Sequence, residues 1–334
     1  MEKYLRPIIF SLAIAINIPP GQACTVFCLQ DSAAIFVGKN LDWPIPIGIA
    51  FYNPSGARKQ SVNARDGNAS WEAVYSSVTA NQFGRNMPLG GMNSAGLVIE
   101  STAYSLSCYP DQNQALVLSE FEWIQYHLDM YRSVNEVIES AQSIAPHKWI
   151  IELHYLIIDA QGNVAYLEWL GGKLNVFTGK DLPVAAQSNN SYQNSIKYLK
   201  AHKGFGGQRN ETNSAASQER FVRAARFLKE THSANKKTAF QGLEIVKQHD
   251  TQWSLVYDSI RRTLHIVTHD SSPNRLIKLD ELEKEHGSQT AMCILKDRSG
   301  DPGDNFFFAL RSEARSNRHQ ICLRSTCWFG RSES

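Results

Sequence analysis

The chain has 334 residues, of which 43% are hydrophobic and 20% charged, and its formal net charge is +2 at pH 7. This length is enough for one large domain or two modest ones, and the near-zero charge gives no support for nucleic acid or an anionic membrane as partner. The six cysteines show neither a zinc-ligand spacing nor a dense disulfide framework. We find no phosphate-binding glycine loop and no His-Glu metal motif. The sequence therefore predicts a globular protein that needs no metal or cofactor.

Residues 1–23 have the layout of a secretory signal peptide. A positively charged start is followed by a short apolar run, and the small residues Gly21 and Ala23 stand at the third-last and last positions before Cys24. The apolar run is too short to span a bilayer, so no membrane span is expected. We predict cleavage after Ala23 and a periplasmic or secreted protein whose mature chain begins at Cys24.

A cysteine at the start of a chain carries a nucleophile and a base in one residue. An α-amine has a reference pKa of about 7.7–8.0, so part of it is neutral near pH 7 and can take the thiol proton. The resulting thiolate is the attacking species in acyl transfer. Two other interpretations of Cys24 stay open: an ordinary disulfide cysteine, or the lipidated cysteine of a bacterial lipoprotein. The lipoprotein pattern is weak, because Gly21 stands where leucine is usual.

Apolar periodicity predicts strands and helices along the rest of the chain. In chain order they are strands at 25–30, 34–39, 48–53 and 71–79, a glycine-rich turn leading into a strand over 90–100, helices at 115–131 and 133–142, strands at 149–159, 164–169 and 173–177, a strand within 184–187, helices from 192, from 218 and at 237–248, and a hairpin of 252–258 and 263–268. His154 lies within one of these strands, and we interpret it as a core histidine. By itself this pattern indicates only a mixed α and β protein.

The C-terminal segment differs in composition from the rest of the chain. Residues 306–334 are rich in arginine and serine and show no clear period. We therefore predict one domain over residues 24–296, followed by a tail of undefined order over residues 297–334.

Two motifs near Cys24 resemble the opening of a known enzyme family. Residues 24–27 (Cys-Thr-Val-Phe), with residues 38–43 (Gly-Lys-Asn-Leu-Asp-Trp), are similar to the start of the choloylglycine hydrolase and penicillin V acylase family. These enzymes are N-terminal-nucleophile cysteine hydrolases of linear amides. Further similar segments follow in the same order: Gly-Met-Asn-x-x-Gly-Leu at 91–97, Ser-Asn-Asn at 188–190, Glu-Arg-Phe-Val-Arg at 219–223, and the closing strands. The resemblance covers roughly residues 24–295 and implies an α+β fold, a four-layer αββα sandwich with two antiparallel sheets between helix layers.

The resemblance implies roles for three residues near the start of the mature chain. Cys24 would be the nucleophile, Asp42 would contact its α-amine, and Lys39 would be a cation beside the sulfur. Both neighbours make chemical sense, because a cation lowers a thiol pKa and a carboxylate orients an ammonium group. Lys39 is a departure, since the family has arginine there. Lysine keeps the charge but lacks the planar fork that orients two partners.

Three further residues would complete the site by the same resemblance. Asn189 falls at the family position whose side chain donates to the oxyanion, and Arg220 at that of an active-site arginine near the nucleophile. The second oxyanion position falls at Ala103. Bile-salt hydrolases carry asparagine and penicillin V acylases tyrosine there, so alanine matches neither. The backbone N–H near Ala103 would still be available as a donor.

The expected activity is hydrolysis of a small-molecule N-acyl amide through an acyl-thioester. The substrate would be a penicillin V-like or N-acyl homoserine lactone amide, with conjugated bile salts as the alternative. A protein of another class, an exported binding protein or lipoprotein with impaired catalysis, is the remaining alternative, prompted by Lys39 and Ala103. The resemblance also implies a homotetramer.

Overall fold

The computed structural model describes most of the predicted mature chain. The described residues are 24–44, 48–61, 70–110, 116–269, 274–295 and the backbone of 308–309. The predicted signal peptide and nearly all of the predicted tail lie outside the described residues. Phe308–Ala309 forms β19, which pairs with β18 (Ala291–Ile294). These two residues of the C-terminal segment therefore extend a sheet of the domain.

The first sheet is built around the strand that begins at the predicted cleavage site. Its six strands lie in the order β14-β1-β2-β15-β16-β17. Their bounds are β1 Thr25–Gln30, β2 Ile35–Asp42, β14 Ala186–Gln187, β15 Thr251–Asp258, β16 Thr263–Thr268 and β17 Arg275–Lys278. All pairs in this sheet are antiparallel. Strand β2 is buried along its whole length, as expected for a strand covered on both faces.

The second sheet has nine strands in the order β13-β12-β11-β8-β7-β6-β3-β18-β19. Those not yet given are β3 Ile49–Asn53, β6 Ser77–Asn81, β7 Pro88–Asn93, β8 Val98–Ala103, β11 Leu153–Ile158, β12 Val164–Leu170 and β13 Lys173–Thr178. Two small pairs lie outside both sheets: β4 (Arg58–Gln60) with β5 (Ser70–Glu72), and β9 (Leu118–Ser119) with β10 (Pro146–His147). Strand β1 contacts β8 and β11, so the two large sheets face each other.

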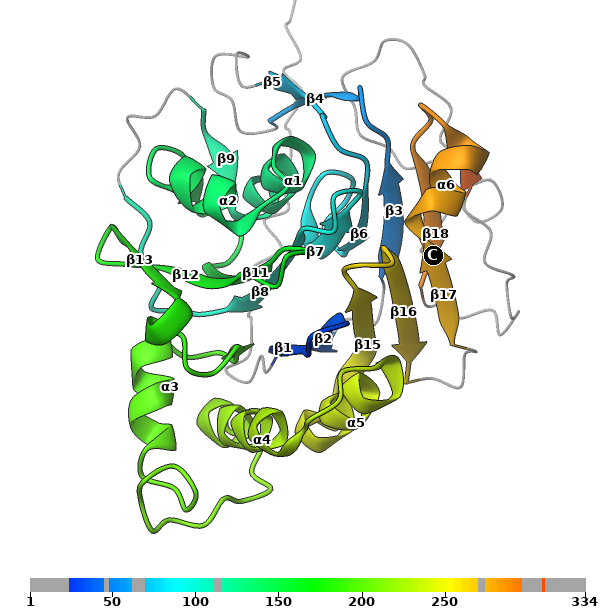
Figure 1. The fold of residues 1–334 in the computed structure, drawn as a ribbon. Coiled ribbons are helices and arrows are strands. Elements are labelled where there is room, and N and C mark those ends of the chain that lie inside the picture. Colours follow the sequence, from blue (N-terminus) through cyan, green and yellow to red (C-terminus); the bar gives the residue numbers. More distant parts are fainter. Residues whose placement is uncertain are drawn as a thin grey trace, which may run out of the picture.

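Helices cover the outer faces of the two sheets. They are α1 Glu120–Met130, α2 Val134–Ala141, α3 Tyr192–Leu199, α4 Ser217–Glu230, α5 Lys236–Val246, α6 Leu279–His286 and the short 3₁₀ helix Gly179–Asp181. Helix α1 packs on β7 and β8, while α4 contacts β1 and α5 contacts β2 and β15. Figure 1 shows the resulting order of helices, nine-stranded sheet, six-stranded sheet and helices. The four-layer αββα sandwich is confirmed.

Helices α1 and α2 begin at capping boxes. Ser119 accepts from the N–H of Glu122, and the Glu122 side chain accepts from the N–H of Ser119. Ser133 and Glu136 form the same reciprocal pair at α2. Each box satisfies two backbone donors that a helix start leaves without partners. The α2 start was predicted, but α1 begins at Glu120 rather than near residue 115.

Two predicted segments differ in the structure. The strand expected over residues 71–79 is divided between β5 and β6, because the chain bends between them. Gly90 and Gly91 do not form a turn but lie inside β7, and the turn falls at residues 94–96, where Gly96 has φ +83°. A Cβ at Gly91 would lie 2.7 Å from the Val78 carbonyl oxygen of β6. Glycine is therefore required in this strand by close packing rather than by a turn.

Candidate active site

Cys24 lies at the start of β1, between the two sheets. Its side chain is buried, and it is free, as are the other described cysteines Cys28, Cys108 and Cys293. Burial raises the pKa of the Cys24 thiol, while the charges of Lys39 and Arg220 act to lower it and that of Asp42 to raise it further. The thiol is therefore neutral at pH 7 in the full chain, and a base is needed to make it nucleophilic.

Asp42 ends β2 beside this sulfur, and its backbone N–H acts to lower the pKa of the thiol. Thr251, its cross-strand neighbour in β15, donates its hydroxyl to Asp42 Oδ1. The other carboxylate oxygen, Oδ2, is buried and has no hydrogen-bond partner among the described residues. Burial raises the pKa of Asp42 to about 7. A buried, unpartnered carboxylate oxygen beside a nucleophile is a place for a cationic group.

Lys39 reaches the site from the middle of β2, paired across the ladder with Val26. Its ammonium lies 2.8 Å from Glu100 Oε2 and 2.6 Å from the Ser101 carbonyl oxygen, both in β8. Glu100 also accepts from the Tyr257 hydroxyl at 2.6 Å. The charge of Lys39 acts to lower the pKa of the Cys24 thiol. Its ammonium is bound by a buried carboxylate that the sequence reasoning did not include, and its role at the sulfur stays a prediction.

Arg220 extends from the first turn of α4 and is fully buried. Its Nε donates to Thr25 Oγ1 at 3.1 Å and its Nη1 to the Ala215 carbonyl at 2.8 Å. Its Nη2 donates to the Cys24 carbonyl at 3.3 Å and to Asn189 Oδ1 at 2.8 Å. The guanidinium thus connects the residue of the nucleophile with the predicted oxyanion residue. Arg223, further along α4, is also buried but donates to carbonyls away from the site.

Asn189 and Ala103 meet across the gap between β14 and β8. The Asn189 Nδ2 group donates to the Ala103 carbonyl at 2.8 Å. Because Arg220 occupies Oδ1, the orientation of this amide is fixed, and its second N–H remains for another acceptor. Tyr104 N–H donates to Glu152 O, so in the ladder with β11 the N–H and C=O of Ala103 point away from β11, toward Asn189.

The structure brings together all six residues predicted for the site. A buried thiol, a carboxylate with an unpartnered oxygen, two cations and two amide donors come from the residue before β1, from β2, β8 and α4, and from the residues that follow β14. This set can support nucleophilic attack on a carbonyl and stabilise the oxyanion that forms. The roles of the individual residues remain predictions.

Sequence reasoning did not include three buried residues near the site. Glu100 and Thr251 were not noticed, and His154 was noticed but interpreted only as a core residue. Glu100 had a recognisable signal, because it follows the apolar residues 97–99, and a carboxylate in a buried strand requires a partner. Thr251 and His154 had no comparable signal. His154 is a core histidine as interpreted, but its ring contacts Thr102 and Tyr166, whose hydroxyls lie against the carbonyls of Ser188 and Asn190.

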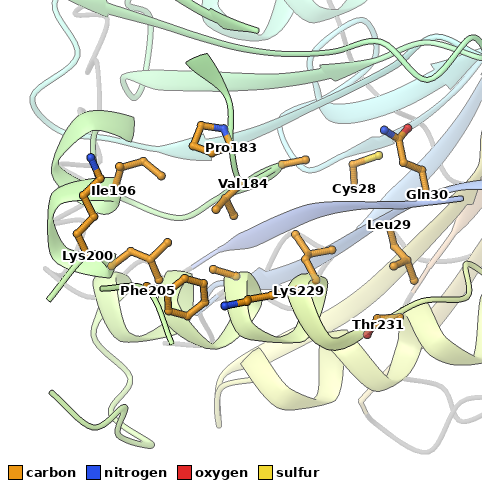
Figure 2. A pocket seen from close by; sticks show the side chains of 14 residues that line it. Cys28, Leu29, Gln30, Pro183, Val184, Ile196, Lys200, Phe205, Lys229 and Thr231 are labelled. Carbon is orange, nitrogen blue, oxygen red and sulfur yellow. The ribbon is translucent and has the colours of Figure 1, made fainter. Parts of the chain in front are cut away.

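A separate cavity of about 500 Å³ lies between β1, α3 and α4 (Figure 2). Cys28, four residues beyond the candidate nucleophile, lines it together with apolar side chains such as Val184 and Phe205. Burial raises the pKa of the Cys28 thiol to about 12. Lys200 and Lys229 also line the cavity, but burial is the cause of this shift, so Cys28 is a protonated, weakly reactive thiol and not a second nucleophile.

The fold and the site fit a hydrolase of linear amides, and the comparison with protein families agrees. Residues 24–247 match the model of the linear amide C-N hydrolases, choloylglycine hydrolase family. The match covers more than half of the chain and begins at Cys24. The chain belongs to this family.

Individual relatives are distant. A penicillin V acylase from Pectobacterium atrosepticum is 24% identical over 237 residues, which are 65% of this chain and 63% of that protein. The chain thus matches less than two thirds of the length of this relative. Among solved structures, penicillin V acylase from Agrobacterium tumefaciens has a TM-score of 0.68 at 22% identity, covering 81% of this chain and 90% of that one. A variant of the conjugated bile acid hydrolase from Clostridium perfringens has a TM-score of 0.64 at 16% identity, covering 82% and 97%.

Proposed function

We propose that this protein hydrolyses a linear N-acyl amide, using Cys24 as an N-terminal nucleophile after removal of residues 1–23. The observation that carries the proposal is the buried Asp42 Oδ2, which has no partner among the described residues and lies beside Cys24. In the full chain the nitrogen of Cys24 belongs to a peptide bond with Ala23. Cleavage would convert it to an α-amine, a cationic group of the kind that this oxygen can bind.

In the proposed reaction the α-amine first accepts the proton of the Cys24 thiol. The sulfur then bonds to the amide carbonyl carbon, and the carbonyl electron pair moves to oxygen, where the Asn189 amide and the Ala103 N–H donate to it. The intermediate collapses with cleavage of the C–N bond, and the leaving amine takes the proton from the α-ammonium. Water, deprotonated by the α-amine, hydrolyses the thioester and regenerates the thiol. Arg220 and Lys39 balance charge around the sulfur.

The leader in residues 1–23 supports export, so we also propose a periplasmic or secreted location. Within the described segments, no helix combines the length and apolar character needed to cross a membrane. A homotetramer, as in the family resemblance, is part of the proposal and is tested by sedimentation of the mature chain.

The substrate class that we favour is a penicillin V-like or N-acyl homoserine lactone amide. The curated relative and one of the structural neighbours are called penicillin V acylases. Conjugated bile salts are the second candidate, since another neighbour is a bile acid hydrolase. Alanine at position 103 lacks the polar side chain that either group of enzymes carries there. This position therefore does not distinguish the two substrate classes, and a panel of acyl amides is needed.

Two measurements test the proposal. Intact mass and N-terminal sequencing of the exported protein should find a free Cys24, and a panel of phenoxyacetyl, long-chain acyl and bile-salt amides should show release of the amine. Cys24→Ala should abolish release while circular dichroism shows an unchanged fold, and Cys24→Ser should retain a trace at most. A lipidated Cys24 with no amine release would favour the binding protein or lipoprotein alternative, and full activity of the alanine variant would reject Cys24 as the nucleophile.

A further inference from the structure

His154 is a buried titratable residue that the proposed mechanism does not use. It lies in β11, opposite Thr102 of β8, and is completely buried. The ring stacks on Tyr104, with centroids 5.2 Å apart and planes inclined by 14°. Nε2 contacts the Thr102 hydroxyl and Nδ1 contacts the Tyr166 hydroxyl. Both ring nitrogens are therefore engaged, each with a hydroxyl group that has one proton to give.

These two hydroxyl groups contact the backbone on either side of Asn189. Thr102 Oγ1 lies 3.1 Å from the Ser188 carbonyl oxygen, and the Tyr166 hydroxyl lies 3.1 Å from the Asn190 carbonyl oxygen. The Gln187 side chain, one residue earlier, donates to the His154 carbonyl at 2.7 Å. The His154 ring therefore contacts two side chains, Thr102 and Tyr166, that lie against the backbone on the two sides of Asn189.

Counting protons assigns the tautomer of a neutral ring. The Ser188 carbonyl already accepts from the Asn190 N–H at 2.9 Å, whereas the Tyr166 hydroxyl is the donor to the Asn190 carbonyl. If Nδ1–H donates to Tyr166, Tyr166 keeps its proton for the Asn190 carbonyl. Nε2 then accepts the single proton of Thr102, which has none left for the Ser188 carbonyl, and that carbonyl keeps its bond from the Asn190 N–H. Burial lowers the pKa of His154, opposed by Glu168, whose Oε2 lies 3.9 Å from Nδ1. A neutral ring with its proton on Nδ1 therefore fits these surroundings.

We propose that His154 is a positioning residue that, through Tyr166, fixes the backbone beside Asn189 and so aims its amide at the oxyanion. The proposal rests on the proposed function for the role of Asn189. Arg220 and Ala103 fix the Asn189 side chain, and the His154 network fixes the main chain that carries it. A small displacement of such a donor weakens the transition state more than it weakens substrate binding.

The first test is Tyr166→Phe, with Tyr155→Phe as its matched control. Tyr155 is equally buried in β11 and also donates to a backbone carbonyl, that of Glu120 at 3.0 Å, but away from Asn189. We expect kcat of the mature Tyr166→Phe enzyme to fall on the order of tenfold, less than the 10²–10³ of losing an oxyanion donor, with KM nearly unchanged. Tyr155→Phe should keep wild-type kcat. An equal fall in both variants would show a merely structural role and overturn the proposal.

A double-mutant cycle with Asn189→Ala gives the sharper result. If the network acts through Asn189, adding Tyr166→Phe or His154→Gln to Asn189→Ala should cause no further fall in kcat. A further fall equal to that in the wild-type background would overturn the proposal. If His154→Gln does not fold, the cycle can still be measured with Tyr166→Phe alone.

A spectroscopic measurement needs no substrate and separates this proposal from the proposed function. The side-chain NH₂ resonances of Asn189, assigned with Asn189→Ala, should shift in Tyr166→Phe and stay in place in Tyr155→Phe. Resonances unmoved by Tyr166→Phe would reject the positioning role. If these resonances shift but the wild-type enzyme cleaves no amide, the positioning stands and the proposed function fails.

Discussion

The Lys39 ammonium lies 2.8 Å from Glu100 Oε2, although 61 residues separate them in sequence. Both side chains are almost completely buried, at 2% and 1% exposure. A buried ion pair is seldom a large net source of stability, but loss of one partner leaves an uncompensated charge. The pair therefore allows a buried cation near Cys24. It does so only because Glu100 supplies the opposite charge in a buried strand.

Glu100→Gln should destabilise the protein by about 3–5 kcal/mol, because it leaves the Lys39 ammonium without its counter-charge. Lys39→Met should have a cost of similar size, since it leaves the Glu100 carboxylate unpaired. The double variant should be more stable than the sum of the two single effects predicts. Urea unfolding of the four proteins measures this coupling, and strictly additive free energies would contradict it.

Gly90→Ala should also destabilise the protein. A Cβ at this position would lie 2.2 Å from the Glu100 carboxyl carbon. An unattached carboxylate would swing away, but this one is held by Lys39 and by Tyr257. We expect a loss of about 1–3 kcal/mol, the usual cost of overpacking, in thermal or urea unfolding. Val74→Ala, at an exposed position, is the control and should be nearly neutral; equal stability of Gly90→Ala and wild type would refute the close approach.

Asp42→Asn should change the pH dependence of stability in the unprocessed chain. Burial raises the pKa of Asp42 from 3.8 to about 7, so the folded state favours the neutral carboxyl. The folded protein is therefore favoured below pH 3.8, and this contribution is lost as the pH rises through about 7. Relative to Asp42→Asn, the wild-type protein should lose up to about 4 kcal/mol of stability between these pH values.

Processing should alter this dependence. An α-ammonium at Cys24 would lower the pKa of Asp42 and reduce the loss of stability with rising pH. Urea unfolding of the unprocessed and mature proteins at pH 5 and pH 8 compares the two states. The same pH dependence in both would show that Asp42 does not contact the new amine.

Arg220→Lys should lower kcat much more than it changes KM. One ammonium group cannot reach Thr25, Ala215, Cys24 and Asn189 together as the guanidinium does. Loss of the bond to Asn189 Oδ1 frees its amide to rotate, so the effect should approach the about 10²-fold cost of removing an oxyanion donor.

Arg223→Lys is the matched control for this prediction. Arg223 lies one turn along α4, is buried, and donates to the carbonyls of Thr212, Ser214 and Ile245 away from the site. Its substitution should lower the melting temperature without a selective fall in kcat. Similar kinetic effects of the two substitutions would contradict the assignment of Arg220 to the site.

The sequence was sufficient for most of the fold. Apolar runs located the strands around Cys24, and apolar periodicity located the helix that begins next to Ser133, because both signals depend on neighbouring residues. It was misleading at Gly90 and Gly91, which look like a turn in sequence. Glycine is required at these two positions because Thr79 and Glu100 on adjacent strands come too close for a side chain. Contacts between strands cannot be predicted from the local sequence.

By itself, the sequence determined which chemical groups are available: a cysteine at a predicted cleavage site, and an aspartate, an asparagine and an arginine at separated motifs. Only the tertiary structure decided how each is bound. It joined Lys39 to Glu100, left Asp42 Oδ2 without a described partner, and placed His154 behind Asn189. The reason is physical: local patterns specify strands and helices, whereas the partner of a buried polar group is decided by which strands face each other across the sandwich.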